Sequence, residues 1–172
     1  MKRRDFFRTA MGAAALAGSY GVLDRTFRST AWAAPESYDL VAIRGGDAET
    51  MFDRGIEAFG GIGAFVRKGH KVVVKPNVGW DVSPDRAGNT NPKLVARIIQ
   101  HCLQAGAKEV YVFDHTCDNW QRCYRNSGIE TAVKDAGGKM APGNSESYYQ
   151  AVTIPAGKTL KKTKEHELML GA

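Results

Sequence analysis

Short runs of consecutive apolar residues alternate along this chain with longer segments in which apolar residues recur at helical spacing. The run at 72–74 is entirely valine, as is typical of a strand covered on both faces. Residues 94–103 repeat apolar side chains at intervals of three and four, the pattern of an amphipathic helix. The same patterns predict further strands over 38–44 and 109–114, weaker strands over 151–154 and near Leu160, and helices after Asp47 and over 129–135.

Residues typical of helix ends and turns mark the borders of these segments. Asp47 and Asn91 are expected to cap the helices that follow them, and Pro92 suits a first helical position. Gly106 is expected to end the second of these helices. Residues 76–91 are rich in Asn, Asp, Gly and Pro, which predicts a long loop.

The alternation of strands and helices predicts an α/β fold with an open, mostly parallel, doubly wound sheet. Ligands of such sheets bind beyond the carboxyl ends of the strands. This rule directs attention to Lys75-Pro76-Asn77 after one predicted strand and to Asp114-His115-Thr116 after another.

The N-terminal segment, residues 1–33, has the composition of an export signal. Arg3-Arg4-Asp5-Phe6-Phe7-Arg8 resembles a bacterial twin-arginine motif, and an uncharged stretch over 9–23 follows it. Ala31-Trp32-Ala33 offers small residues for cleavage after Ala33. We therefore expect export by the twin-arginine translocase to the periplasm, with 34–172 as the α/β domain. An ordinary secretory signal and an uncleaved anchor are the alternatives, although the stretch is shorter than the roughly 20 residues of a membrane span.

The positive charge of the chain lies mostly in this segment. The whole chain has 24 basic and 18 acidic residues, of which six and two lie in 1–33, so the remainder has a net charge of only +2. Nucleic-acid binding therefore has no electrostatic footprint in 34–172. We expect no nucleic-acid partner and no stable membrane span in the mature chain.

Two groups of residues are candidates for ligand chemistry. Lys75, with amide and hydroxyl donors and the start of the helix at Pro92, would suit a carboxylate or phosphate. The alternative is that the lysine is solvated and the asparagines only cap and turn. The predicted ligand-binding set is Lys75, Asn77, Thr90, Asn91, Asp114 and His115.

The second group is His115 with Cys117 and Cys123, whose imidazole and thiolates would suit zinc, copper or iron. A Cys117–Cys123 disulfide and two ordinary thiols are the alternatives. Cys102 is the third cysteine, and an odd count in an exported protein leaves at least one thiol unpaired or otherwise engaged.

Several short motifs occur in the order and spacing of a known family. The chain resembles the family labelled domain of unknown function 362 over roughly residues 38–172, through Val72-Val73-Val74, Lys75-Pro76-Asn77, Asn89-Thr90-Asn91-Pro92, Gly106-Ala107-Lys108-Glu109-Val110 and Phe113-Asp114. The resemblance implies a longer protein, so we expect that the chain is truncated at its C-terminus. Some members carry ferredoxin-like iron–sulfur modules, but this chain has no Cys-x-x-Cys.

These observations define the fold more closely than the reaction. The sequence contains no Ser-His-Asp order, paired-carboxylate pattern or phosphate loop, so whether the protein is an enzyme stays open, as does any cofactor. We expect an exported protein that binds a small anionic ligand or cofactor at the strand ends, with a redox link as one form of this function. A non-catalytic periplasmic module for a ligand or metal is the alternative.

Overall fold

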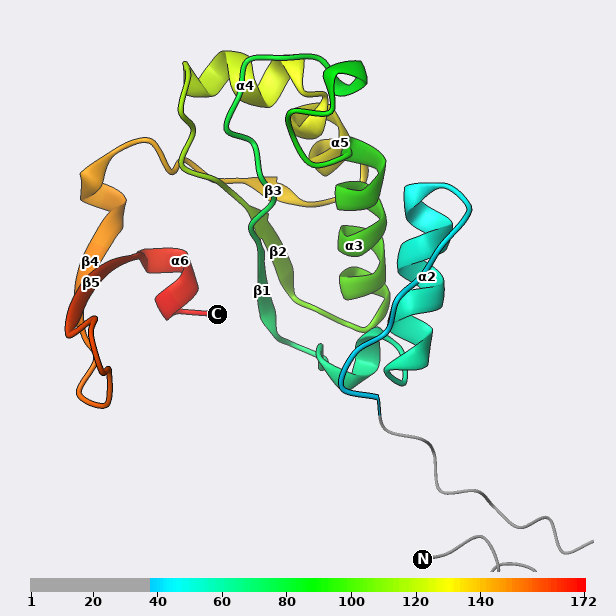
Figure 1. The fold of residues 1–172 in the computed structure, drawn as a ribbon, viewed down its shortest axis with the longest axis horizontal. Helices are drawn as coiled ribbons and strands as arrows, with labels where there is room; N and C mark the ends of the chain where they lie inside the picture. The colour runs from blue at the N-terminus through cyan, green and yellow to red at the C-terminus, as the bar shows by residue number, and fades with distance from the viewer. Residues whose placement is uncertain (1–37) are drawn as a thin grey trace, which may run out of the picture. The chain divides into compact units, whose positions relative to one another are not determined.

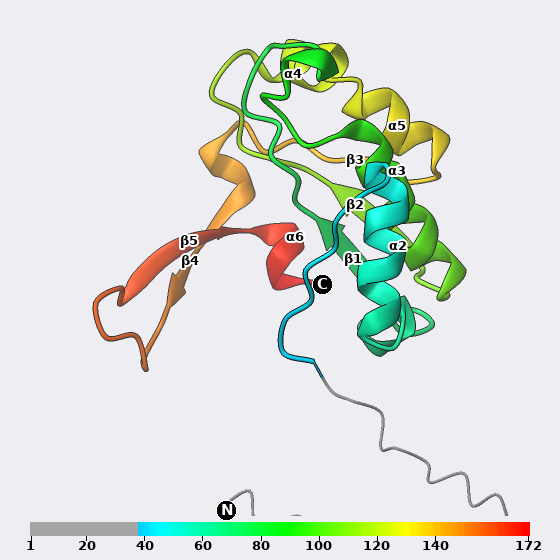
Figure 2. The ribbon, with the colours of Figure 1, turned by 45° about the vertical axis from the view of Figure 1, so that its right-hand side comes forward.

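A computed structural model describes residues 38–172, which belong to one compact unit. The predicted signal peptide, residues 1–33, and the predicted first mature residue, Ala34, lie outside the described residues. Along the chain the elements are α2 (Ala48–Ala58), β1 (Lys71–Val74), α3 (Pro92–Gln104), β2 (Glu109–Val112), α4 (Trp120–Asn126), α5 (Ile129–Asp135), β3 (Lys139–Met140), β4 (Tyr149–Thr153), β5 (Lys162–His166) and α6 (Glu167–Leu170) (Figures 1 and 2). Within the described residues, three short 3-10 turns cover Ile62–Ala64, Pro84–Arg86 and Glu146–Tyr148.

A parallel three-stranded sheet in the order β1-β2-β3 forms the centre of the unit. Val72 pairs with Val110 in the first ladder, and Val112 pairs with Met140 in the second. All three strands therefore point their carboxyl ends toward the same edge, where β1 leads into the loop after Val74 and β2 into Phe113 and Asp114. The predicted α/β fold with a parallel sheet is confirmed.

Helices α3 and α5 cover one face of this sheet, and α2 packs on the outer side of α3 (Figure 1). The buried valines of β2, Val110 and Val112, meet Val95 and Ile99 of α3 in the core on this face. The opposite face carries Val73 and Tyr111, and the short helix α6 lies beside them. The doubly wound arrangement that the sequence predicts is not confirmed within residues 38–172.

The predicted helix ends are confirmed by side-chain hydrogen bonds. Asp47 accepts a bond from the backbone N–H of Thr50 at 2.7 Å, and Asn91 accepts one from the N–H of Lys93 at 2.9 Å. Gly106 follows α3 with a φ of +90°, a conformation that glycine adopts without strain. These local signals fix where the chain leaves each helix and returns to the sheet.

Residues 38–44 and 120–126 differ from the sequence predictions, and the short elements β3 and α6 were not predicted either. Residues 38–44 are irregular and not a strand, and Leu40 is exposed, because this short apolar run has no ladder partner in the described chain. Helix α4 was not predicted, since its sequence is mainly polar. Its apolar residues Trp120, Cys123 and Tyr124 nevertheless follow helical spacing, and Asn119 caps it by accepting a bond from the N–H of Arg122.

Strands β4 and β5 form an antiparallel hairpin, and His166 at the end of β5 packs against the carboxyl edge of the sheet. This imidazole is 2% exposed and stacks on Phe113 with 3.9 Å between ring centroids. Its Nε2 donates to the Pro142 carbonyl at 2.9 Å, and its Nδ1 accepts from the Leu168 N–H at 3.2 Å. The hairpin thus adds one wall to the edge at which β1 and β2 end. Among the described helices, none has the length and apolar character needed to cross a membrane.

Candidate functional site at the carboxyl edge of the sheet

Lys75 and Asp114 follow the ends of neighbouring strands and form an ion pair. The Asp114 side chain is only 6% exposed, whereas that of Lys75 is 50% exposed. A buried carboxylate needs a partner because burial removes it from water. The pair therefore places a carboxylate inside the protein and an ammonium at its surface.

Three further hydrogen bonds fix the position of Asp114. Its second carboxylate oxygen accepts the N–H of Val78 at 2.8 Å. The hydroxyl of Tyr124 accepts the Asp114 N–H and donates to the Asp114 carbonyl, both at 2.9 Å. Burial raises the pKa of Tyr124, so this hydroxyl keeps its proton and its donor role at neutral pH. The backbone at the end of β2 is thus rigidly held.

The His115 imidazole is oriented by a backbone carbonyl. Its Nδ1 lies 2.8 Å from the oxygen of Gly143, and because a carbonyl only accepts, this nitrogen carries the proton. The Tyr149 hydroxyl donates to the same oxygen at 3.0 Å. A Cβ on Gly143 would lie 2.7 Å from the carbonyl oxygen of Asp114, so this close approach requires glycine. The Nε2 atom of His115 has no partner within residues 38–172.

Lys75 and His115 line a common cleft of about 270 Å³ between the sheet edge and the hairpin, which we call the His115 cleft. Tyr149 and His166 from the hairpin form its aromatic side, and Lys164 is its second lysine. Burial is the main cause that raises the pKa of Tyr149. The cleft therefore combines two ammonium groups and an imidazole with aromatic surface.

Two acidic residues line this cleft, and a third, Asp114, lies behind it. Glu146 pairs with Lys164 across the rim, and the hydrogen bond from Lys164 lowers the pKa of this carboxyl. Glu165 also lines the cleft, whereas the carboxylate of Asp114 does not. A ligand in the cleft would thus meet the ammonium of Lys75 in front of the carboxylate that holds it.

The other predicted ligand-binding residues organise the loop over 76–91. The backbone N–H of Asn77 donates to the Thr90 hydroxyl, and the Asn77 amide donates to the Gly88 carbonyl, both at 2.9 Å. Asn91 caps α3, and the first residue of that helix packs near Gly128. None of these three polar side chains lines the His115 cleft. These three side chains therefore do not share the His115 cleft with Lys75 and His115.

The predicted metal ligands His115, Cys117 and Cys123 are not assembled around one point. Both cysteines approach Gly79: the Cys117 N–H donates to its carbonyl at 2.9 Å, and the Cys123 thiol lies 3.6 Å from the same oxygen. The His115 ring instead faces Gly143. Over residues 38–172 no three His, Cys, Asp or Glu side chains are grouped to hold a metal ion, and the three cysteines are free thiols.

Sequence reasoning missed the contribution of the hairpin to this site. Tyr149, Lys164 and His166 reach the cleft from β4 and β5, which were predicted only as weak strands. The apolar spacing of the hairpin is poor because its strands are mostly exposed. The available signal was the gathering of aromatic residues at 148–149 before a strand, which is unusual for a fully solvated segment.

The comparison with protein families gives one match. A family model described as a domain of unknown function (DUF362) matches residues 72–172, which is more than half of the chain. This range contains β1 except its first residue, the loop and helix α3 that follow it, β2 and the hairpin β4–β5. No curated protein and no solved structure matches the chain.

Proposed function

We propose, from the premise that this chain belongs to the DUF362 family, that it binds a small anionic ligand in the His115 cleft. One observation carries the proposal: Lys75 and His115 follow different strands and line one cleft, while the carboxylate that pairs with Lys75 is buried behind it. Carboxyl ends of parallel strands are the usual place for ligands in α/β folds.

The hydrogen-bonding capacity of the cleft supports an anion. An ammonium has three donors, and Asp114 uses one of those of Lys75. The pair between Lys164 and Glu146 is largely exposed, with side chains 60% and 78% exposed, and such pairs contribute little stability. Lys164 can therefore turn from Glu146 to a ligand at small cost.

Calorimetric titration of the full chain with phosphate and with succinate tests this proposal. We expect saturable binding that weakens about fivefold in Lys75→Met, because one partly exposed charge contributes up to about 1 kcal/mol. Lys71→Met is the matched control: Lys71 begins the same strand roughly 13 Å away, beyond the Debye length of about 8 Å. Absence of saturable binding, or equal losses in both variants, contradicts the proposal.

A second variant guards against unfolding of Lys75→Met, which leaves Asp114 buried without its cation. In Lys75→Met with Asp114→Asn, the amide oxygen still accepts the Val78 N–H and no buried charge is left. The double variant should fold and show the same loss of anion affinity. Retention of full affinity in the folded double variant would remove Lys75 from the site.

We also propose that the protein is exported by the twin-arginine translocase to the periplasm. The support is the Arg3-Arg4 pair, the weakly apolar stretch behind it and the small residues before Ala34. An enzyme and a non-catalytic binding module are both compatible with an anion in the cleft.

A further inference from the structure

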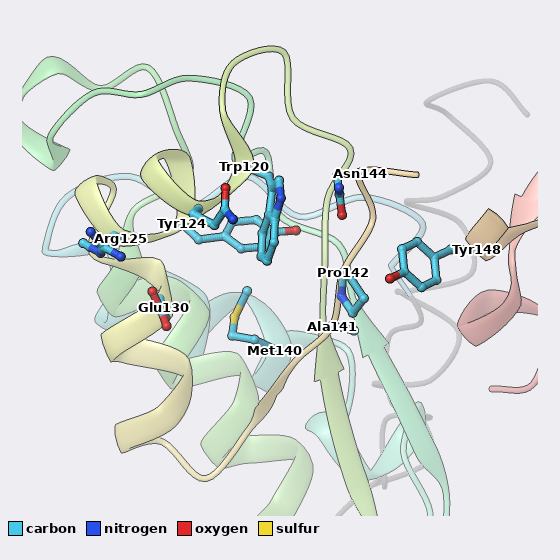
Figure 3. A pocket seen from close by; sticks show the side chains of 10 residues that line it. Trp120, Tyr124, Arg125, Glu130, Met140, Ala141, Pro142, Asn144 and Tyr148 are labelled. Atoms are coloured by element: carbon cyan, nitrogen blue, oxygen red, sulfur yellow. The ribbon is translucent and has the colours of Figure 1, made fainter. Parts of the chain in front are cut away.

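A second and larger hollow lies at the end of β3, between α4, the start of α5 and the segment that follows β3 (Figure 3). We call this hollow the Trp120 pocket. Its volume is about 520 Å³, within the usual range of small-molecule sites. No residue that lines it also lines the His115 cleft. It is therefore a separate site, and its argument does not depend on the proposed function.

Aromatic and apolar side chains form the body of the Trp120 pocket. Trp120 meets Tyr124 edge to face, with 6.0 Å between ring centroids, and Met140 and Pro142 add apolar surface. In Figure 3 Trp120 and Met140 lie between Arg125 and Glu130 at one end and Asn144 and Tyr148 at the other. A flat apolar group is the ligand part that such a surface would take.

Arg125 supplies a charge that the protein itself does not neutralise. Within residues 38–172 its guanidinium makes no hydrogen bond and no ion pair, although it lines the pocket. Glu130, the acidic residue of the pocket, is paired with Lys134 at 2.5 Å. Arg125, Glu130 and Lys134 together carry a net charge of +1. A guanidinium forms its strongest hydrogen bonds with a carboxylate.

The remaining polar groups indicate where a ligand would hydrogen-bond. The hydroxyl of Tyr124 is already engaged by the Asp114 backbone, so only its ring is available to the pocket. The side-chain amides of Gln121 and Asn144 have no partner in the described chain and also line the pocket. The polar contacts would therefore come from α4 and from the segment after β3, around an apolar centre.

We propose that the Trp120 pocket binds an aromatic carboxylate, with its ring against Trp120 and its carboxylate on Arg125. The aromatic walls favour the ring, and the unpaired guanidinium selects the anion. An uncharged analogue of the same shape would keep the apolar contacts and lose the charged one. This difference gives the proposal a direct test.

The test is calorimetric titration of the full chain with 3-phenylpropionate and with the uncharged 3-phenylpropionamide. We expect saturable binding of the acid, about tenfold tighter than that of the amide, because a hydrogen bond to a charged group is worth about one such factor. Arg125→Met should remove this difference. Its side chain has no partner to lose within 38–172, so the variant should fold.

Arg122→Met is the matched control, since Arg122 lies one turn earlier on α4, pairs with Asp81 at 2.5 Å and does not line the pocket. It should bind the acid like the wild type, and so should the folded double variant Lys75→Met with Asp114→Asn, which changes no residue that lines the Trp120 pocket. Equal losses in both arginine variants would overturn the proposal. So would a loss in the folded double variant without one in Arg125→Met, or the absence of saturable binding.

Discussion

Asp114 connects the chemistry of the strand end to the packing beneath it. Its side chain holds Lys75 at the surface, and its backbone is held by the Tyr124 hydroxyl. The rule that ligands bind at strand ends directed the sequence prediction to Lys75, Asp114 and His115, which follow β1 and β2 in the structure. The sequence did not indicate which of them is buried and which is exposed to a ligand. That difference depends on the packing around Asp114 and on Tyr124, which belongs to a helix that was not predicted.

Tyr124→Phe should destabilise the protein by about 1–3 kcal/mol, because it removes two buried hydrogen bonds and leaves the Asp114 N–H unpaired. Tyr148→Phe is the control, since the Tyr148 hydroxyl has no partner within the described residues, and it should change stability by less than about 0.5 kcal/mol. Urea unfolding followed by circular dichroism measures both. Similar stabilities for the two variants would show that the Tyr124 hydroxyl does not hold the strand end.

At the scale of elements, predictions succeeded where one local signal sufficed. The valine run of β1 and the caps of α2 and α3 are such signals. The failures, residues 38–44 and α4, depend on tertiary contacts: the first has no strand to pair with, and the second buries Cys123 and Tyr124 in the core. Side-chain pairs between elements were likewise invisible from the sequence.

The contact between α2 and α3 gives a pH-dependent prediction. Asp53 of α2 accepts two bonds from Arg97 of α3, both at 2.8 Å, and one contact of 2.8 Å from His101. The hydrogen bond from Arg97 is the main cause that lowers the pKa of Asp53. A lowered pKa means that this pair stabilises the fold at neutral pH and that its contribution is lost as the pH falls through the pKa of the folded state.

Asp53→Asn should therefore lower stability at pH 7 by a few tenths to about 1 kcal/mol, given that the pair is partly exposed. Glu57→Gln, on the same helix, is the control, and it should have no such effect. The difference between Asp53→Asn and the wild type should shrink as the pH is lowered below the ordinary carboxyl range. A difference that stays constant from pH 7 to pH 3, measured by thermal unfolding, would exclude this ion pair as its source.

At the scale of the whole molecule, the carboxyl edge of the sheet carries two separate hollows. The segment between β3 and β4 contributes to both: Pro142 and Tyr148 line the Trp120 pocket, and Glu146 lines the His115 cleft. The edge was predictable from the fold class, but its division in two was not, because the hairpin and α4 create it. The net charge of 34–172 is small, so local groups such as Lys75 and Arg125 decide which ligands bind.

Export is a property of the whole chain, and it has its own prediction. Changing Arg3 and Arg4 together to lysine should abolish periplasmic accumulation, because the twin-arginine route depends on the paired arginines. Arg25→Lys with Arg28→Lys, outside the motif, should leave accumulation unchanged. Cell fractionation with immunodetection measures both variants. Unchanged periplasmic yield of the Arg3, Arg4 variant would exclude this route.

The central claim is that an anion binds beside His115. The chemical shifts of the His115 imidazole nitrogens test this claim most directly. Nitrogen-15 NMR of the full chain should show the Nε2 resonance of His115 moving saturably as phosphate or succinate is added at constant pH and ionic strength. His70 and His101 do not line the cleft, so the resonances of their imidazole nitrogens should not shift. An unchanged His115, or histidine shifts that move together without saturation, would contradict the account.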